Sequence, residues 1–229
     1  MHETRDSGWR IWLLGLALVV VGYFGPWIPH KTVALTVTGF ELAEFAKFFP
    51  QVQGGVVPIH RVLFYSPFVA AFFLLALVAG RSAIRPVRLI VPLFAAAVLL
   101  VALLPYSVVG GLRQALTSRS PFVPDPEYTE QLAILFVGVV LVLLTPLAGR
   151  FSRRARAILV ALLALVGAVP ALWQFVLLHP LVAALYHARL GPGWGLIGCM
   201  VGFALLLISA VFTAVSSERS SPVEGQSLP

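Results

Sequence analysis

Six long apolar runs, separated by loops that carry arginine, cover most of this chain of 229 residues. An α-helix needs about 20 predominantly apolar residues to cross roughly 30 Å of hydrocarbon. Lipid offers no partner to backbone N–H and C=O groups, and these runs are too long and too uniformly apolar to be barrel strands. The sequence therefore predicts an all-α, polytopic integral membrane protein with six transmembrane helices, at about residues 11–28, 62–80, 89–109, 132–149, 157–178 and 194–215.

The domain organisation follows from the shortness of the loops. Hydrophobic residues make up 59% of the chain, and no loop is long enough to build a water-excluding core of its own. We predict a single six-helix membrane domain over residues 1–215. The remaining segment, 216–229, is rich in Ser, Pro and Gly, a composition that predicts a disordered cytoplasmic tail.

The net charge of +7 would suggest a nucleic-acid partner if the protein were soluble. In membrane proteins, however, basic residues gather on cytoplasmic loops by default. Here they lie on short loops rather than on one continuous face with aromatic residues between them, which argues against nucleic-acid binding. The single cysteine, Cys199, has no thiol partner in the chain, so dithiol redox chemistry is excluded.

Arginine and lysine also predict the orientation. Ten of them fall on one side of the predicted spans: Arg5, Arg10, Arg81, Arg85, Arg88, Arg150, Arg153, Arg154, Arg156 and Arg219. Six are spread over the longer loops of the other side: Lys31, Lys47, Arg61, Arg113, Arg119 and Arg189. The positive-inside rule then places both termini in the cytoplasm. The expected location of the protein is the plasma (inner) membrane of a bacterium. The arginine-rich turns are expected to contact lipid headgroups, or alternatively to dock a cytoplasmic ATPase.

The outer loop between the first two spans contains a predicted amphipathic helix at about residues 39–49. Thr38 and Glu41 have the spacing of a capping box, and Pro50 is expected to end the helix. Phenylalanines lie along one flank of this segment, which predicts a helix in the membrane interface with its apolar face towards the bilayer. The candidate contacts with a partner protein or with lipid are Phe45, Phe48 and Phe49. The alternative is that they pack on the chain's own bundle.

Four histidines are expected at the outer face, each near a helix end: His30, His60, His179 and His187. Neutral imidazole, together with the nearby acidic residues, suits Zn, Cu, Fe or Ni. No two of these histidines share a helix at metal-ligand spacing, so a metal or haem site would require several loops to converge. We therefore predict no cofactor, and keep these residues as weak metal-ligand candidates.

Within the predicted spans there is no Asp, Glu, Lys, Arg or His. Ion-coupled transporters and proton relays usually keep such residues inside the bundle, so this absence argues against those classes. Among the uncharged polar residues of the predicted spans, Gln174 is the most notable. It is a candidate for lining a cavity, and alternatively it makes a hydrogen bond between two helices. Pro26, Pro105 and Pro170 fall in the outer halves of three spans and could open a cavity lined by Gly22 and Gln174.

The last predicted span begins with a glycine-rich stretch. Gly198 and Gly202 are four residues apart, a spacing that allows another helix to approach closely. This pattern fits contact with another subunit and fits equally packing within the bundle.

No catalytic signature is present: there is no G-x-S-x-G, H-E-x-x-H, P-loop or C-x-x-C motif. The sequence therefore favours a non-enzymatic membrane protein, an accessory or structural subunit of a larger bacterial membrane complex, with lipids and other membrane subunits as partners. The alternative is a permease-like subunit of an ATPase-driven transporter for a hydrophobic or lipid-like solute. A third hypothesis is a protein that binds metal or haem at its outer face.

Overall fold

The computed structural model describes residues 3–29, 36–80, 82, 84–118, 121, 125–187 and 190–218. Its long helices are α1 (Glu3–Phe24), α4 (Ser66–Ala79), α5 (Arg85–Leu103), α7 (Thr129–Leu143), α8 (Arg153–Leu185) and α9 (Trp194–Glu218). Shorter helices are α2 (Leu42–Phe45), α3 (Pro50–Gln53) and α6 (Tyr106–Ser118), with 3₁₀ turns η2 (Ala46–Phe48), η3 (Arg61–Tyr65), η4 (Pro126–Tyr128) and η5 (Thr145–Arg150). Two short strands, β1 (Pro26–Ile28) and β2 (Val37–Thr38), pair antiparallel.

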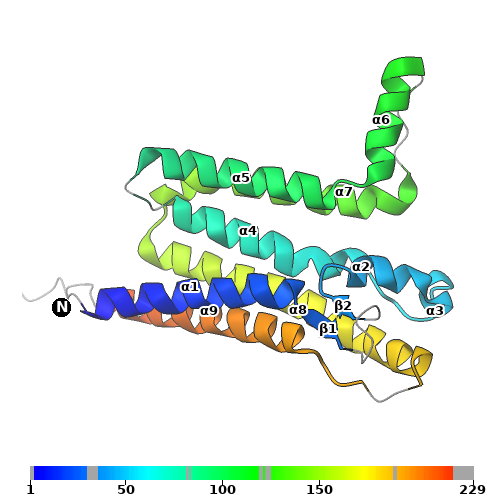
Figure 1. The fold of residues 1–229 in the computed structure, drawn as a ribbon. Coiled ribbons are helices and arrows are strands. Elements are labelled where there is room, and N and C mark those ends of the chain that lie inside the picture. The colour runs from blue at the N-terminus through cyan, green and yellow to red at the C-terminus, as the bar shows by residue number, and fades with distance from the viewer. Residues whose placement is uncertain are drawn as a thin grey trace, which may run out of the picture.

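The long helices form one elongated bundle (Figure 1). Helix α1 runs along α9, and α9 also packs against α8. Helix α4 contacts α8 on one side and α5 on the other, while α7 pairs with α5. Continuous with η3, α4 is the most deeply buried of the long apolar segments. It is therefore the central helix that joins the α1–α8–α9 half to the α5–α7 half.

Aromatic residues fill the core where α1, η3 and α8 meet. The rings of Tyr23 and Phe68 stack with their centroids 5.7 Å apart, and Trp27 meets Phe175 edge-on at 6.0 Å. The Tyr23 hydroxyl donates a hydrogen bond of 3.0 Å to the Phe64 carbonyl. Aromatic pairs of these geometries add to the stabilisation that burial alone provides, so this cluster fixes the end of α1 against the rest of the bundle.

Five segments in the described parts of the chain are helical, long and apolar enough to cross a membrane: Arg61–Ala79, Arg85–Leu103, Pro126–Leu143, Arg153–Leu185 and Trp194–Val215. The all-α prediction is confirmed, and these helices indicate membrane association. In α1 the apolar stretch, Arg10–Phe24, is shorter than the other five. Residues 219–229 of the predicted tail lie outside the described residues, while α9 continues through Glu218.

The first predicted span, 11–28, was too long at its end. Helix α1 stops at Phe24, and Pro26–Ile28 form strand β1 instead of a last helical turn. Pro26 has no backbone N–H to donate within a helix, and the residues after it find partners in β2. The carbonyl of Gly22, which a helix-internal proline would free, accepts hydrogen bonds from the Trp27 indole and from the Gly25 N–H.

The third predicted span, 89–109, was wrong beyond Leu103. Leu104 has an extended backbone (φ −73°, ψ 116°), as expected for a residue whose helical conformation would clash with the following proline. Pro105 thus separates α5 from α6, and residues that were placed in an outer loop form a second helix. In contrast, α8 runs for 33 residues through Pro170 and Pro180 without a break, well past the predicted end at residue 178.

The predicted amphipathic helix at residues 39–49 is divided. Residues 42–48 form α2 and η2 in succession, Phe49 is extended, and Pro50 begins α3. The capping box is confirmed: the Glu41 carboxylate accepts from the Thr38 N–H at 2.9 Å, and the Thr38 hydroxyl accepts from the Glu41 N–H at 3.3 Å. These contacts fix the start of the segment that carries the candidate site.

Candidate functional site

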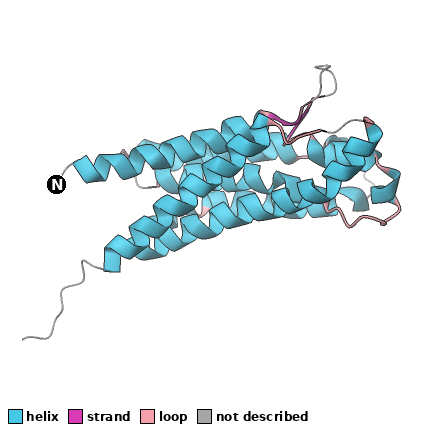
Figure 2. Cartoon of the chain, turned by 90° about the horizontal axis from the view of Figure 1, so that it is seen from below, coloured by secondary structure: helices cyan, strands magenta, loops and turns pink. Residues whose placement is uncertain are grey.

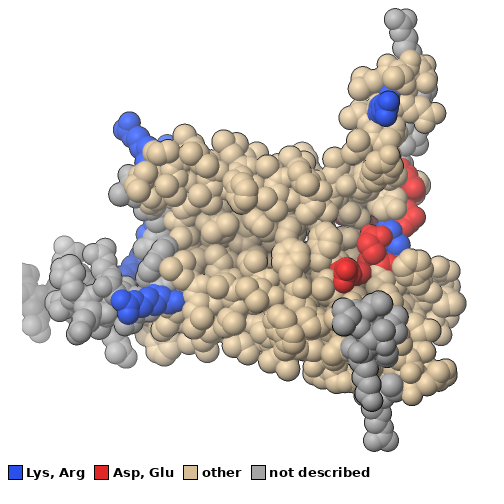
Figure 3. All heavy atoms as spheres, viewed as in Figure 1, with Lys and Arg blue, Asp and Glu red and all other residues tan. Residues whose placement is uncertain are grey.

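Charged side chains gather at the two ends of the bundle. Acidic side chains, with basic ones among them, lie where α2 and the start of α7 lie, and basic side chains mark the opposite end, where α1 begins (Figures 1 and 3). We call the first the acidic end and the second the basic end. The candidate site is at the acidic end, where the 36–60 segment, which contains β2, α2, η2 and α3, meets η3 and η4.

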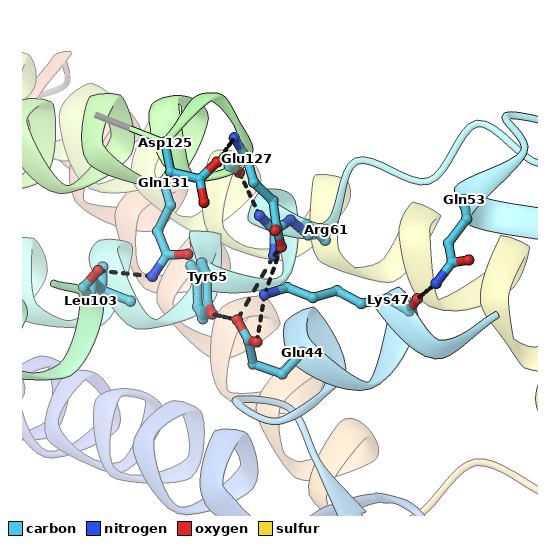
Figure 4. A network of polar contacts seen from close by, with 9 residues as sticks. All are labelled: Glu44, Lys47, Gln53, Arg61, Tyr65, Leu103, Asp125, Glu127 and Gln131. Atoms are coloured by element: carbon cyan, nitrogen blue, oxygen red, sulfur yellow. Dashed lines mark hydrogen bonds and ion pairs between the residues drawn. The ribbon is translucent and has the colours of Figure 1, made fainter. Parts of the chain in front are cut away.

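Four side chains form an ion-pair cluster there: Glu44, Lys47, Arg61 and Glu127 (Figure 4). The Lys47 ammonium lies 2.7 Å from Glu44 Oε2 and 3.0 Å from Glu127 Oε1. The Arg61 guanidinium lies 3.2 Å from Glu127 Oε1 and 3.9 Å from Glu44 Oε1, and it also donates to the Glu127 carbonyl. Each cation thus bridges both carboxylates.

Aromatic rings complete the cluster. The Lys47 ammonium lies 4.8 Å from the centre of the Tyr128 ring, and the Arg61 guanidinium lies 5.3 Å from it. Cations at such distances are attracted to the negative face of the ring. The Tyr65 hydroxyl donates to Glu44 Oε1 at 3.4 Å. Two of these residues belong to η3, two to α2 and η2, and two to η4, so the cluster joins three parts of the chain.

The neighbouring side chains change the pKa of Lys47. Partial burial alone would lower the pKa of its ammonium, but hydrogen bonds and charge attraction from Glu44 and Glu127 outweigh that effect. The pKa of Lys47 is therefore raised above its usual value of 10.5. Because Lys47 and Arg61 are partly buried while both carboxylates are half-exposed, the two cations depend on the carboxylates to compensate for the loss of water around them.

Local sequence positions each member of the cluster. Glu44 and Lys47 are three residues apart and so lie on one side of a helical turn. The Asp125 carboxylate accepts from the Glu127 N–H at 3.0 Å, which caps η4 and places Glu127 towards Arg61. Lys47 and Arg61 were used above only to predict the orientation of the chain, and the cluster was not predicted. The spacing of Glu44 and Lys47 was the one local pattern that pointed to an ion pair here.

Both carboxylates are paired with cations, and the Tyr65 hydroxyl donates to the Glu44 carboxylate, which is already paired. The cluster is suited to holding the 36–60 segment on the bundle.

Gln174, predicted as a cavity residue, is buried on α8 with 2% of its surface exposed. Its side-chain oxygen accepts from the backbone N–H of His60 at 2.9 Å. Gln131 acts similarly on α7, where its amide donates to the Leu103 carbonyl at the end of α5. Each amide thus joins its helix to the backbone of another segment. For Gln174 the partner is the residue that precedes η3 rather than a residue of a second helix.

The three candidate histidines that the structure describes, His60, His179 and His187, do not form a metal-binding group. His30 lies outside the described residues. The backbone N–H of His60 donates to the Gln174 side chain, and the His179 ring makes a 2.8 Å hydrogen bond with the Leu190 carbonyl. His187 lies in the turn after α8 with φ of 47°. No group of three His, Cys, Asp or Glu side chains within the described ranges is placed to hold a metal ion.

The glycine candidates lie between α1 and α9. A Cβ atom added to Gly22 would stand 2.3 Å from the Cys199 nitrogen, so α9 occupies the space that a cavity would need. A Cβ on Gly202 would stand 2.6 Å from the Gly15 carbonyl oxygen, whereas one on Gly198 would meet only the Gly22 Cα at 3.7 Å. Gly202 thus allows α9 to pack closely on α1, whereas the side chain missing at Gly198 would find ordinary space.

The three phenylalanines have different surroundings. Phe49 is buried, Phe45 is half-buried, and the two rings meet edge-on with their centroids 5.4 Å apart. Phe48 is 77% exposed. The expected contact surface for a partner is therefore reduced to Phe48, which follows directly after Lys47 of the ion-pair cluster.

Comparisons of the chain with protein-family models, with curated proteins and with solved structures give no match.

Proposed function

We propose that this protein is a non-enzymatic integral membrane protein that acts as an accessory or structural subunit of a bacterial membrane complex. We place both termini in the cytoplasm and the acidic end at the outer face. The excess of arginine and lysine in the short loops on the side of the basic end supports this orientation. Contact with other membrane subunits is its working role.

The observation that carries the proposal is the exposure of Phe48 on a segment that is firmly held. Phe48 belongs to η2, and 77% of its surface is exposed. Its neighbour Lys47 is held by two carboxylates, and the Gln53 amide donates to the Lys47 carbonyl at 2.7 Å. These contacts fix the backbone that carries Phe48, so this part of the chain needs little further ordering on binding. Aromatic side chains presented by such a backbone are typical of the anchor residues of interfaces.

The polar groups at the acidic end support a structural role over catalysis. Glu44, Glu127, Lys47 and Arg61 neutralise one another, and Gln174 and Gln131 satisfy backbone groups. Polar networks of this kind favour one arrangement of the segments that they join. The exposed side chain of η2 that could contact a partner is that of Phe48, which is apolar and therefore suits contact with another protein.

Site-specific photo-crosslinking tests the proposal. A photoreactive amino acid at position 48, in protein expressed at its native level in intact membranes, is expected to give one discrete adduct with a membrane protein. Position 51, an exposed glutamine on neighbouring α3, is the matched control and should give less adduct. If the protein purifies alone in nanodiscs and position 48 crosslinks lipid only, the subunit role is wrong.

A further inference from the structure

Helix α6 leaves the bundle. It begins directly after the break at Leu104–Pro105 and runs across the direction of the long helices, away from all of them (Figure 1). None of its 13 residues is buried. The described parts of the chain thus leave this helix without a packing partner, although helices of this length are marginal on their own in water.

The side chains of α6 are divided between two faces. Val109, Leu112 and Leu116 are three and four residues apart, which places them along one flank of the helix, and all three are exposed. The other side carries Gln114 and Thr117, whose hydroxyl donates back to the helix at the Arg113 and Gln114 carbonyls. An apolar flank and a polar flank on a helix of low overall hydrophobicity are typical of helices that lie on a membrane surface.

The connections of α6 set its depth. It follows α5, a candidate span that ends at Leu103, and it precedes the candidate span Pro126–Leu143. The segment that contains α6 is therefore joined at both of its ends to a candidate span, at the level where that span leaves the hydrocarbon. At about 1.5 Å per residue, the helix reaches roughly 20 Å sideways from the bundle. A helix tied at this level and directed across the spans lies in the plane of the membrane surface.

Helix α5, to which α6 is joined, also exposes apolar side chains. Phe94, Leu100 and Val101 are exposed on α5, with Val101 at 85%. If α5 crosses the bilayer, these side chains contact lipid. The apolar flank of α6 would then contact the same lipid layer at the membrane surface. Tyr106, 89% exposed at the junction, is the kind of residue that gathers at the boundary between hydrocarbon and headgroups.

We propose that α6 is an interfacial helix bound to lipid. Val109, Leu112 and Leu116 insert among the upper acyl chains, and Tyr106 lies at the headgroup boundary. Arg113 extends its apolar stem along the surface and pairs its guanidinium with lipid phosphate. The helix fixes the rotation and depth of the α5–α7 pair, which contacts the rest of the bundle mainly through α4.

Spin labels report the depth of α6 in vesicles of phosphatidylethanolamine and phosphatidylglycerol. Leu112→Cys and Leu116→Cys test the apolar flank, and Gln114→Cys tests the polar flank. Val101→Cys on α5 is the lipid-facing control, and Gln51→Cys on α3 is the water-facing control. Cys199 is buried, so the wild-type chain treated with the label gives the background signal.

We expect labels at positions 112 and 116 to collide more often with lipid-soluble oxygen than with a water-soluble nickel chelate, as at position 101. The label at position 114 should show the reverse preference, as at position 51. If positions 112 and 116 behave like position 51, α6 lies in water and the proposal is wrong. Low collision rates with both reagents would mean that protein covers the flank, and would equally overturn it.

Discussion

Gly198 and Gly202 lie four residues apart on α9 but have different neighbours. An added Cβ at position 202 would stand 2.6 Å from the Gly15 carbonyl oxygen and 2.7 Å from the Val19 nitrogen. Both are backbone atoms of α1, which cannot move aside without shifting the helix. We expect Gly202→Ala to destabilise the protein by about 1–3 kcal/mol through overpacking. A lower midpoint of thermal unfolding in detergent would measure this.

Gly198→Ala is the matched control for that experiment. Its Cβ would meet only the Gly22 Cα at 3.7 Å, an ordinary contact distance. Since alanine favours a helix over glycine by roughly 0.5–1 kcal/mol, the midpoint should stay the same or rise. Equal losses at both positions would show that α1 and α9 do not approach each other as described.

Lys47 gives a prediction about pH. Its pKa in the folded protein is raised above 10.5, so the stability that its charge contributes is fully present below the unfolded pKa. That contribution is lost only as the pH rises through the folded pKa. We therefore expect the difference in unfolding midpoint between the wild type and Lys47→Met to stay constant between about pH 7 and pH 10.

Lys47→Arg, which keeps the positive charge, should retain most of the wild-type midpoint over the same range. If burial instead dominated, the pKa of Lys47 would fall below 10.5 and its charge would destabilise the fold. A difference between the wild type and Lys47→Met that changes steadily from neutral to alkaline pH would contradict the arrangement in Figure 4.

At the scale of elements, the ion-pair cluster holds the 36–60 segment against η3 and η4. Glu127→Gln removes the carboxylate that lies within 3.2 Å of both Lys47 and Arg61. Because this carboxylate is half-exposed, the cost in global stability should be small, about 1 kcal/mol or less. We expect a local effect instead: faster amide hydrogen exchange in α2, η2 and α3, measured by mass spectrometry.

Glu130→Gln is the control for this change. Glu130 lies in the first turn of α7 and makes no ion pair within the described residues, so its substitution removes a charge near the same helix end without touching the cluster. Hydrogen exchange in residues 42–53 should remain at the wild-type rate. Identical exchange in both variants would mean that the cluster does not hold this segment.

The elements differ in how far the sequence predicts them. The helical class and the capping box at Thr38 and Glu41 follow from local patterns of hydrophobicity and hydrogen bonding, and they were predicted. The break at Leu104–Pro105 was not, because Pro170 and Pro180 stand in equally apolar surroundings and leave α8 intact. Whether a proline ends a helix or remains within it depends on the packing around it, which a single sequence does not contain.

The candidate site was harder to predict for a related reason. Glu44 and Arg61 are separated from Glu127 by more than sixty residues, and only the packing of α7 beside α4 and η3 brings them together. The spacing of Gly198 and Gly202 indicated a close helix contact but could not identify α1 as the partner. Local spacing predicts which face of a helix makes a contact, whereas the identity of the partner requires the tertiary arrangement.

For the whole molecule, the decisive question is how many times the chain crosses the membrane. Helices α1 and α9 begin and end, respectively, at the basic end of the bundle (Figure 2). Five candidate spans separate the turn at Gly54 and Gly55 from the end of α9, and α1 alone separates that turn from the N-terminus. Since the apolar stretch of α1, Arg10–Phe24, is shorter than the rest, α1 is the crossing that needs a test.

Fusions at three points test the topology. We expect green fluorescent protein to fluoresce at either terminus, and alkaline phosphatase to be active only when inserted at Gly55, whose φ of +68° marks an exposed turn. The excess of arginine at the basic end supports this orientation, and the pairing of α1 with α9 along its length supports a full crossing by α1. Phosphatase activity at the C-terminus and not at Gly55 would reverse the orientation. Activity at the N-terminus as well as at Gly55 would mean that α1 does not cross, because the two fusions would then lie on the same side.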